Sequence, residues 1–109
     1  MKINIVKWAN VTERIRFDKE MQRAFLKFYN KLKDADWNNP NDVLKTFNTA
    51  DIINCAESNR IVFNVGGNKY RMICGYHFGK TFIQLFIKFV GNHAAYEAVD
   101  VCKVIMFEK

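Results

Sequence analysis

The spacing of hydrophobic residues changes once along this chain, from a helical period to a strand period. In the segment 12–33, large apolar side chains recur every three or four positions, at Phe17, Met21, Phe25, Phe28 and Leu32. This spacing is typical of an amphipathic helix with one face against a core. From Arg60 onward the apolar residues alternate or form β-branched runs, as in strands. The order of helices before strands predicts the α+β class, with two amino-terminal helices packed on a small antiparallel sheet.

Shorter signals place other elements in the first half of the chain. Residues 2–7 alternate polar and apolar side chains and predict a short strand. Asn10, with Glu13 three positions later, has capping-box spacing and predicts the start of the long helix. An asparagine before Pro40 predicts a second, short helix over residues 40–47. The polar segment 48–59 is expected to be a loop.

The second half predicts a hairpin followed by a long strand. Gly66-Gly67-Asn68 tolerates positive φ and connects strands over 60–65 and 69–77. The longest strand is expected over 81–90. Its core face would carry Ile83, Leu85, Ile87 and Phe89, and its open face Phe82, Gln84, Phe86, Lys88 and Val90.

A short helical turn is predicted after the long strand. Asn92 can cap this turn, which would run through Glu97 and set His93 beside Tyr96 at positions i and i+3. Residues 99–107 are interpreted as a closing strand rather than the end of a helix.

The composition predicts one domain over residues 1–109. The chain is half hydrophobic and has a single proline, which suits one compact core without a linker. The amino terminus does not have the pattern of a signal peptide, and no apolar run approaches the roughly 20 residues that span a bilayer. A cytoplasmic protein without a membrane partner is therefore expected. Cys55, Cys74 and Cys102 are few and far apart, so reduced structural thiols are expected.

Charge is distributed unevenly along the chain. Residues 60–93 carry five basic side chains and no acid, whereas residues 34–59 carry one basic side chain and five acids. A basic segment of this length without carboxylates indicates a polyanionic partner. The lysine-rich residues 1–33 are interpreted as a solvated face.

The motifs for metal-dependent or nucleotide-dependent chemistry are absent from the sequence. There is no HExxH, no GxxxxGK[ST] and no cysteine pair at ligand spacing, so neither a metal nor a cofactor is expected. The available groups are cations, hydroxyls and imidazoles. These suit metal-free cleavage of RNA, in which one group takes the proton of the 2′-hydroxyl, cations balance the phosphorane and another group protonates the leaving oxygen.

Two sequence blocks, VFNVGGNKYR (62–71) and FIKFVGNHAAY (86–96), resemble the paired signature of HigB-family toxins. These are small RelE-like mRNA interferases of bacterial toxin–antitoxin modules. The segment ADWNNP (35–40) resembles the connection between the helices of that family, so the resemblance covers essentially the whole chain. It implies the RelE-like fold, mRNA cleavage at the ribosome and neutralisation by a helix-turn-helix antitoxin.

The family pattern differs from this chain at several positions. Where the family usually has Thr-His-x-Glu-Tyr-Asp, this chain has Asn-His-Ala-Ala-Tyr-Glu, with Ala95 in place of the acid. Lys88 stands where arginine is common, and lysine keeps the charge but not the planar fork that binds phosphate in two places. The recurrent pair, His93 and Tyr96, is retained.

The candidate residues follow from the resemblance and from the basic segment. The catalytic candidates are His93, Tyr96, Lys88 and Arg71. The RNA-binding candidates are Lys69, Tyr70, Arg60 and Gln84. His77 is interpreted as structural. An endoribonuclease toxin is the main hypothesis, a non-catalytic RNA- or ribosome-binding module is the alternative, and a protein-interaction domain with an acidic partner is a third possibility.

Overall fold

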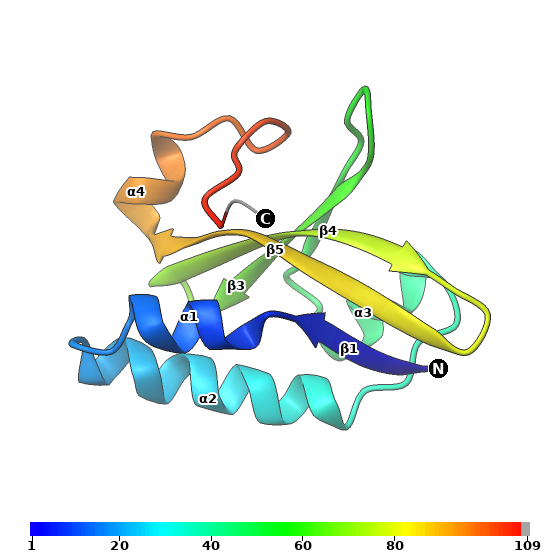
Figure 1. Ribbon diagram of the computed structural model, residues 1–109, viewed down its shortest axis with the longest axis horizontal. Helices are drawn as coiled ribbons and strands as arrows, with labels where there is room; N and C mark the ends of the chain where they lie inside the picture. Colours follow the sequence, from blue (N-terminus) through cyan, green and yellow to red (C-terminus); the bar gives the residue numbers. More distant parts are fainter. Residues whose placement is uncertain (108–109) are drawn as a thin grey trace.

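The computed structural model describes residues 1–107 as a five-stranded sheet with a different cover on each face (Figure 1). The elements are β1 (Lys2–Val6), α1 (Trp8–Arg14), α2 (Lys19–Lys33), a 3-10 turn (Pro40–Asp42), α3 (Val43–Thr46), β2 (Asp51–Ile53), β3 (Arg60–Val65), β4 (Tyr70–Phe78), β5 (Phe82–Asn92) and α4 (His93–Glu97). The strand order is β1-β5-β4-β3-β2. Helices α1 and α2 lie on one face, and α4 with the carboxyl-terminal segment lies on the other.

The sheet is mixed, which corrects the expected antiparallel sheet. β1 pairs in parallel with β5, from Lys2 opposite Phe82 to Val6 opposite Phe86. The other neighbouring strands are antiparallel. Local alternation identified β1 as a strand but carried no information about its partner, because pairing direction is decided by long-range contacts. The α+β class is confirmed.

The long helix predicted over residues 12–33 is two helices. The side chain of Asp18 accepts a hydrogen bond from the Met21 backbone N–H at 3.0 Å, so Asp18 and not Asn10 caps α2. The helical stripe is confirmed from Met21 onward, where the apolar side chains are buried. Phe17 lies in the connection before the cap and is 88% exposed, so its assignment to the core was wrong.

The short helix after Pro40 is confirmed as a 3-10 turn continuing into α3. The side chain of Asn39 accepts from the Asn41 backbone N–H at 3.0 Å, as expected of an asparagine before a helix-starting proline. The following loop contains β2, a three-residue strand at the sheet edge. This strand was not expected. It forms by pairing with β3, from Asp51 opposite Val62 to Ile53 opposite Arg60.

The hairpin of β3 and β4 is confirmed. Gly66 and Gly67 both have positive φ, of 64° and 69°. A Cβ atom on Gly66 would lie 3.0 Å from the Cβ of Ala24 on α2, so a glycine there also allows α2 to approach the turn.

β5 contains an irregularity at Lys88. Ile73 on β4 pairs with Phe89, whereas the next residue, Cys74, pairs with Ile87, so Lys88 has no partner on β4. The additional residue changes the alternation of the strand. Ile83, Leu85 and Ile87 face the helices as predicted, but Phe89 belongs to the opposite face and Val90 to the helix side. Such β-bulges are common beside functional sites because they redirect side chains.

Two apolar clusters of unequal size lie on the two faces of the sheet. The larger one, under α1 and α2, includes the fully buried rings of Phe25, Trp37 and Phe63. On the opposite face, called here the outer face, the smaller cluster consists of Val62, Ile73 and Phe89. Ile53 of β2 packs against it, and the other side chains that cover it come from α4 and the segment after it, namely Tyr96, Val99, Val101, Val104 and Met106.

The carboxyl-terminal segment, residues 99–107, crosses the outer face without regular secondary structure, so the closing strand predicted there was wrong. Cys102 in this segment forms a disulfide with Cys55, which corrects the expectation of three reduced thiols. Cys74 is a free, fully buried thiol, as expected. No helix within residues 1–107 has the length and apolar character needed to cross a membrane.

Candidate functional site

Helix α4 begins where β5 ends and brings two of the predicted site residues together. The side chain of Asn92 accepts from the Ala95 backbone N–H at 2.8 Å, so the predicted cap is confirmed. The backbone N–H of His93 donates to the Lys69 carbonyl at 3.0 Å, which ties the start of α4 to the hairpin turn. His93 and Tyr96 therefore occupy adjacent positions on a helical turn anchored at both β4 and β5.

Arg71 lies beside the ring of Tyr96. Its guanidinium carbon is 5.5 Å from the ring centroid, which is cation–π geometry. The guanidinium also donates to the Asn68 side-chain oxygen at 3.0 Å and to the Asn68 carbonyl at 3.2 Å. Arg71 is only 8% exposed, so this buried side chain connects the hairpin turn at Asn68 to the ring of Tyr96.

His93 is the more accessible member of this group. Its side chain is 44% exposed, and Nδ1 lies 3.4 Å from a carboxylate oxygen of Glu97, one helical turn later. A carboxylate beside one ring nitrogen orients the imidazole and leaves the other nitrogen to face a substrate. The structure thus groups His93, Tyr96 and Arg71 at one end of the outer face; this set is called the α4 cluster below.

Lys88 lies apart from the α4 cluster. It lies four positions before Asn92 on β5, which corresponds to roughly 13 Å of extended chain. Met106 of the carboxyl-terminal segment donates its backbone N–H to the Lys88 carbonyl at 2.8 Å, so this segment crosses β5 at Lys88. Sequence reasoning grouped Lys88 with the catalytic candidates, but it is a separate positive charge farther along the outer face.

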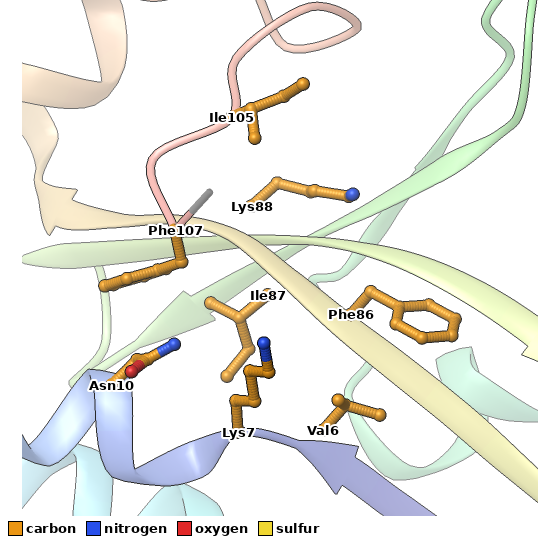
Figure 2. A pocket seen from close by; sticks show the side chains of 8 residues that line it. All are labelled: Val6, Lys7, Asn10, Phe86, Ile87, Lys88, Ile105 and Phe107. Atoms are coloured by element: carbon orange, nitrogen blue, oxygen red, sulfur yellow. The ribbon is translucent and has the colours of Figure 1, made fainter. Parts of the chain in front are cut away.

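A pocket of about 230 Å³ lies at Lys88, where β5 continues beyond the end of β1 (Figure 2). Its polar lining comes from Lys7, Lys88 and Asn10, and Figure 2 shows the Lys88 side chain pointing away from the other two. No carboxylate within residues 1–107 forms an ion pair with Lys88. The remaining lining is apolar or aromatic and comes from Val6, Phe86, Ile87, Ile105 and Phe107.

Sequence reasoning missed most of this pocket. Lys7 was interpreted as part of a solvated face, although its backbone has a positive φ of 63°, which is unusual for a residue other than glycine. Ile105 and Phe107 are distant in the sequence from the other pocket residues. A β-strand, a helix start and a chain end meet here only after folding, so no local pattern could have predicted the pocket.

Two of the RNA-binding candidates, Tyr70 and Arg60, are buried and have partners within the protein. Tyr70 is buried on the helix side, with its ring 6.2 Å from that of Phe25, and burial, with the charge of Glu20 nearby, raises the pKa of its phenol. Arg60 is 7% exposed, and its Nη1 donates to the carbonyls of Val101 and Val104 at 2.9 and 2.7 Å. Both side chains are largely withdrawn from solvent.

The other two RNA-binding candidates remain accessible. Lys69 is exposed, but it forms an ion pair and a hydrogen bond with Glu20 of α2, and that contact raises the pKa of Lys69. Gln84 is half-buried on β5, opposite His77 of β4, between two residues that face the helices. The basic segment is therefore acid-free in sequence only, since Glu20 and Glu97 supply carboxylates to it in space.

No group of three or more histidine, cysteine or acidic side chains in the described part of the chain is arranged to hold a metal ion. This observation concerns arrangement alone. The chemically versatile groups on the outer face are the imidazole, phenol and guanidinium of the α4 cluster and the ammonium of Lys88.

The model of the HigB toxin family, described as the RelE-like toxic component of a toxin–antitoxin system, matches residues 21–99. The match contains β2 to β5 and the whole α4 cluster. No curated protein matches the chain. Because the family model covers well over half of the sequence, this chain belongs to the HigB toxin family, the RelE-like toxic components of toxin–antitoxin systems.

Proposed function

We propose that this toxin is an endoribonuclease that cleaves mRNA at the ribosome without a metal ion. The observation that carries the proposal is the α4 cluster, where a half-exposed imidazole lies one helical turn from a phenol that packs on a guanidinium. These are groups that can transfer protons and balance phosphate charge. Membership of the RelE-like toxins supports the same conclusion.

The proposed chemistry uses the nucleophile of the substrate. The 2′ oxygen of RNA forms a bond to phosphorus while the bond from phosphorus to the 5′ oxygen breaks. Either His93 takes the proton from the 2′-hydroxyl and Tyr96 donates one to the leaving 5′ oxygen, or His93 donates to the leaving oxygen, water takes the 2′ proton and Tyr96 orients the ribose. Arg71 supports the tyrosine ring and adds positive charge behind it, and much of the rate comes from positioning.

Lys88 has a different role in this proposal, as a phosphate contact along the path of the RNA. Its pocket combines ammonium groups with aromatic side chains, Phe86 and Phe107, on which a base could stack. Lys69 and Gln84 are proposed as further contacts on the same strand of RNA.

We expect Lys88→Ala to weaken RNA binding and to lower the slope of log affinity against log salt by about one, as for the loss of one phosphate contact. Fluorescence anisotropy with a short single-stranded RNA over a series of salt concentrations measures both quantities. Lys45→Ala is the matched control, because Lys45 is on α3, away from the outer face, and is paired with Asp42 at 3.2 Å. Equal salt-dependence slopes for wild type and Lys88→Ala would contradict a phosphate contact at Lys88.

Cleavage is tested by incubating the purified chain with RNA alone, with RNA and EDTA, and with translating ribosomes. We expect some cleavage of RNA alone at high protein concentration, unaffected by EDTA, and faster cleavage on ribosomes. Loss of all activity in EDTA, restored by one specific metal, would contradict the metal-free mechanism. Salt-sensitive binding without any cleavage would instead indicate the second candidate, a non-catalytic RNA- or ribosome-binding module. The observation in favour of this candidate is Ala95, which stands where the family usually has an acid.

The family implies an antitoxin as partner. We further propose that this antitoxin is a helix-turn-helix protein, that the toxin acts in the cytoplasm, and that an acidic segment of the antitoxin approaches the basic outer face. Opposite charges would accelerate the encounter. Co-purification of the chain with the product of a neighbouring gene tests the pairing.

A further inference from the structure

The disulfide between Cys55 and Cys102 joins two segments that are 47 residues apart in sequence. Cys55 lies in the loop between β2 and β3, and Cys102 lies in the carboxyl-terminal segment. Their Cα atoms are 5.6 Å apart, within the roughly 4.4–6.8 Å that a disulfide requires. The bond therefore ties the end of the chain to the sheet edge beside β3.

The disulfide is within reach of small molecules. Both cysteines are half-buried, and they line a surface hollow of about 320 Å³ together with Arg60, Glu57 and Lys103. Cys74 provides the contrast, because it is fully buried under the sheet and burial strongly raises the pKa of its thiol. A buried thiol of this kind does not form the reactive thiolate, so thiol–disulfide exchange is confined to Cys55 and Cys102.

The segment that the disulfide holds has few other restraints. No strand or helix is present in residues 99–107. Arg60 donates to two of its carbonyls, and Met106 donates to the Lys88 carbonyl. Its other contacts with the sheet are made by side chains: Val101, Val104 and Met106 pack on the small outer-face cluster, and Phe107 packs against the larger core. A segment with so few backbone hydrogen bonds to the rest of the protein opens at low cost once its covalent tie is cut.

We propose that Cys55 and Cys102 form a reversible thiol–disulfide exchange site that locks the carboxyl-terminal segment over the outer face when oxidised and releases it when reduced. A low-molecular-weight disulfide such as glutathione disulfide is the oxidant. One protein thiolate attacks it and displaces one glutathione thiolate, and the second protein thiolate then attacks the mixed disulfide, forms the Cys55–Cys102 bond and displaces the other. A dithiol reduces the bond: one of its thiolates attacks the protein disulfide and displaces one cysteine thiolate, and its second thiolate then displaces the other and closes the dithiol's own disulfide. In reducing compartments, disulfides are usually transient and redox-sensing in this way.

Release of the segment changes access to Lys88. Ile105 and Phe107 line the Lys88 pocket (Figure 2), and between them the Met106 backbone N–H donates to the Lys88 carbonyl. In the reduced protein this part of the outer face becomes available to RNA. This consequence rests on the proposed function, whereas the exchange site and the release of the segment do not.

The first test follows thiols and backbone protection without RNA. After treatment with glutathione disulfide, the folded protein should incorporate no N-ethylmaleimide, and after dithiothreitol it should incorporate two equivalents, at Cys55 and Cys102 by peptide mass spectrometry. Hydrogen exchange at the Met106 amide should accelerate roughly tenfold or more on reduction. Labelling of Cys55 and Cys102 after the oxidant, or equal protection of Met106 in both forms, would overturn the proposal.

The second test measures RNA affinity in the two redox forms. Reduced protein should bind a short single-stranded RNA roughly tenfold more tightly, the effect of one regained charged contact. The double variant Cys55→Ser/Cys102→Ser should bind like reduced protein and ignore dithiothreitol. Equal affinity of the two wild-type forms would overturn the link to RNA. If neither form binds RNA while labelling and hydrogen exchange change as expected, the proposed function fails and the exchange site stands.

Discussion

Replacement of His93 by alanine is expected to lower the turnover of RNA by roughly 10²–10⁴-fold, the usual contribution of general acid–base catalysis. Affinity for RNA should change little, because His93 is proposed to transfer a proton and not to hold the phosphate chain. Imidazole exchanges protons near neutral pH without a large change in its surroundings, which suits this role. The fold should tolerate this replacement, since the His93 side chain is 44% exposed and its removal leaves no cavity.

Single-turnover cleavage with enzyme in excess measures the chemical step, and anisotropy measures affinity in parallel. The control is His77→Ala, which removes the other histidine of the chain. His77 is exposed near the end of β4, where it pairs with Gln84 of β5. It should cleave at the wild-type rate. If His93→Ala cleaves as fast as wild type, or if both variants lose activity equally, the α4 cluster is not the catalytic site.

Replacement of Phe63 by alanine is expected to reduce the free energy of unfolding by about 3–5 kcal/mol, the range for removing a fully buried aromatic ring. The ring lies in the middle of the larger core and is fully buried. Its centroid is 5.2 Å from that of Phe28 on α2 and 5.4 Å from that of Phe47 after α3. Three elements thus meet at one side chain on β3, and the surrounding rings cannot close the cavity without moving a helix.

Urea unfolding followed by tryptophan fluorescence measures the loss, with the disulfide kept oxidised in every sample. Phe17→Ala is the matched control, because Phe17 is 88% exposed and the same change there should remain within about 0.5 kcal/mol of wild type. Similar losses for the two variants would contradict the assignment of β3 and α2 to a common core.

Signals contained within a few neighbouring residues were interpreted correctly from the sequence. The apolar spacing from Met21 to Leu32 predicted the buried face of α2, and the two glycines predicted the turn between β3 and β4. The caps at Asn39 and Asn92 were identified as well. Each of these features depends on backbone groups and side chains less than about one helical turn or one hairpin apart, so their energetics are local.

Errors arose where pairing or register over a long distance decides the outcome. A single unpaired residue at Lys88 moved Phe89 to the outer face and Val90 to the core. The alternation of a strand predicts two faces, but it cannot predict where one strand of a pair gains a residue.

The candidate site divides in the same way. His93 and Tyr96 were predicted as neighbours because one helical turn sets their spacing, and this part of the site was determined by the sequence alone. Tertiary structure decided that Arg60 holds the carboxyl-terminal segment, that Tyr70 packs against α2, that Lys88 stands apart and that Cys55 meets Cys102. Those outcomes depend on which surfaces the chain buries against one another, and burial is a property of the whole fold, to which each residue contributes but which no short segment specifies.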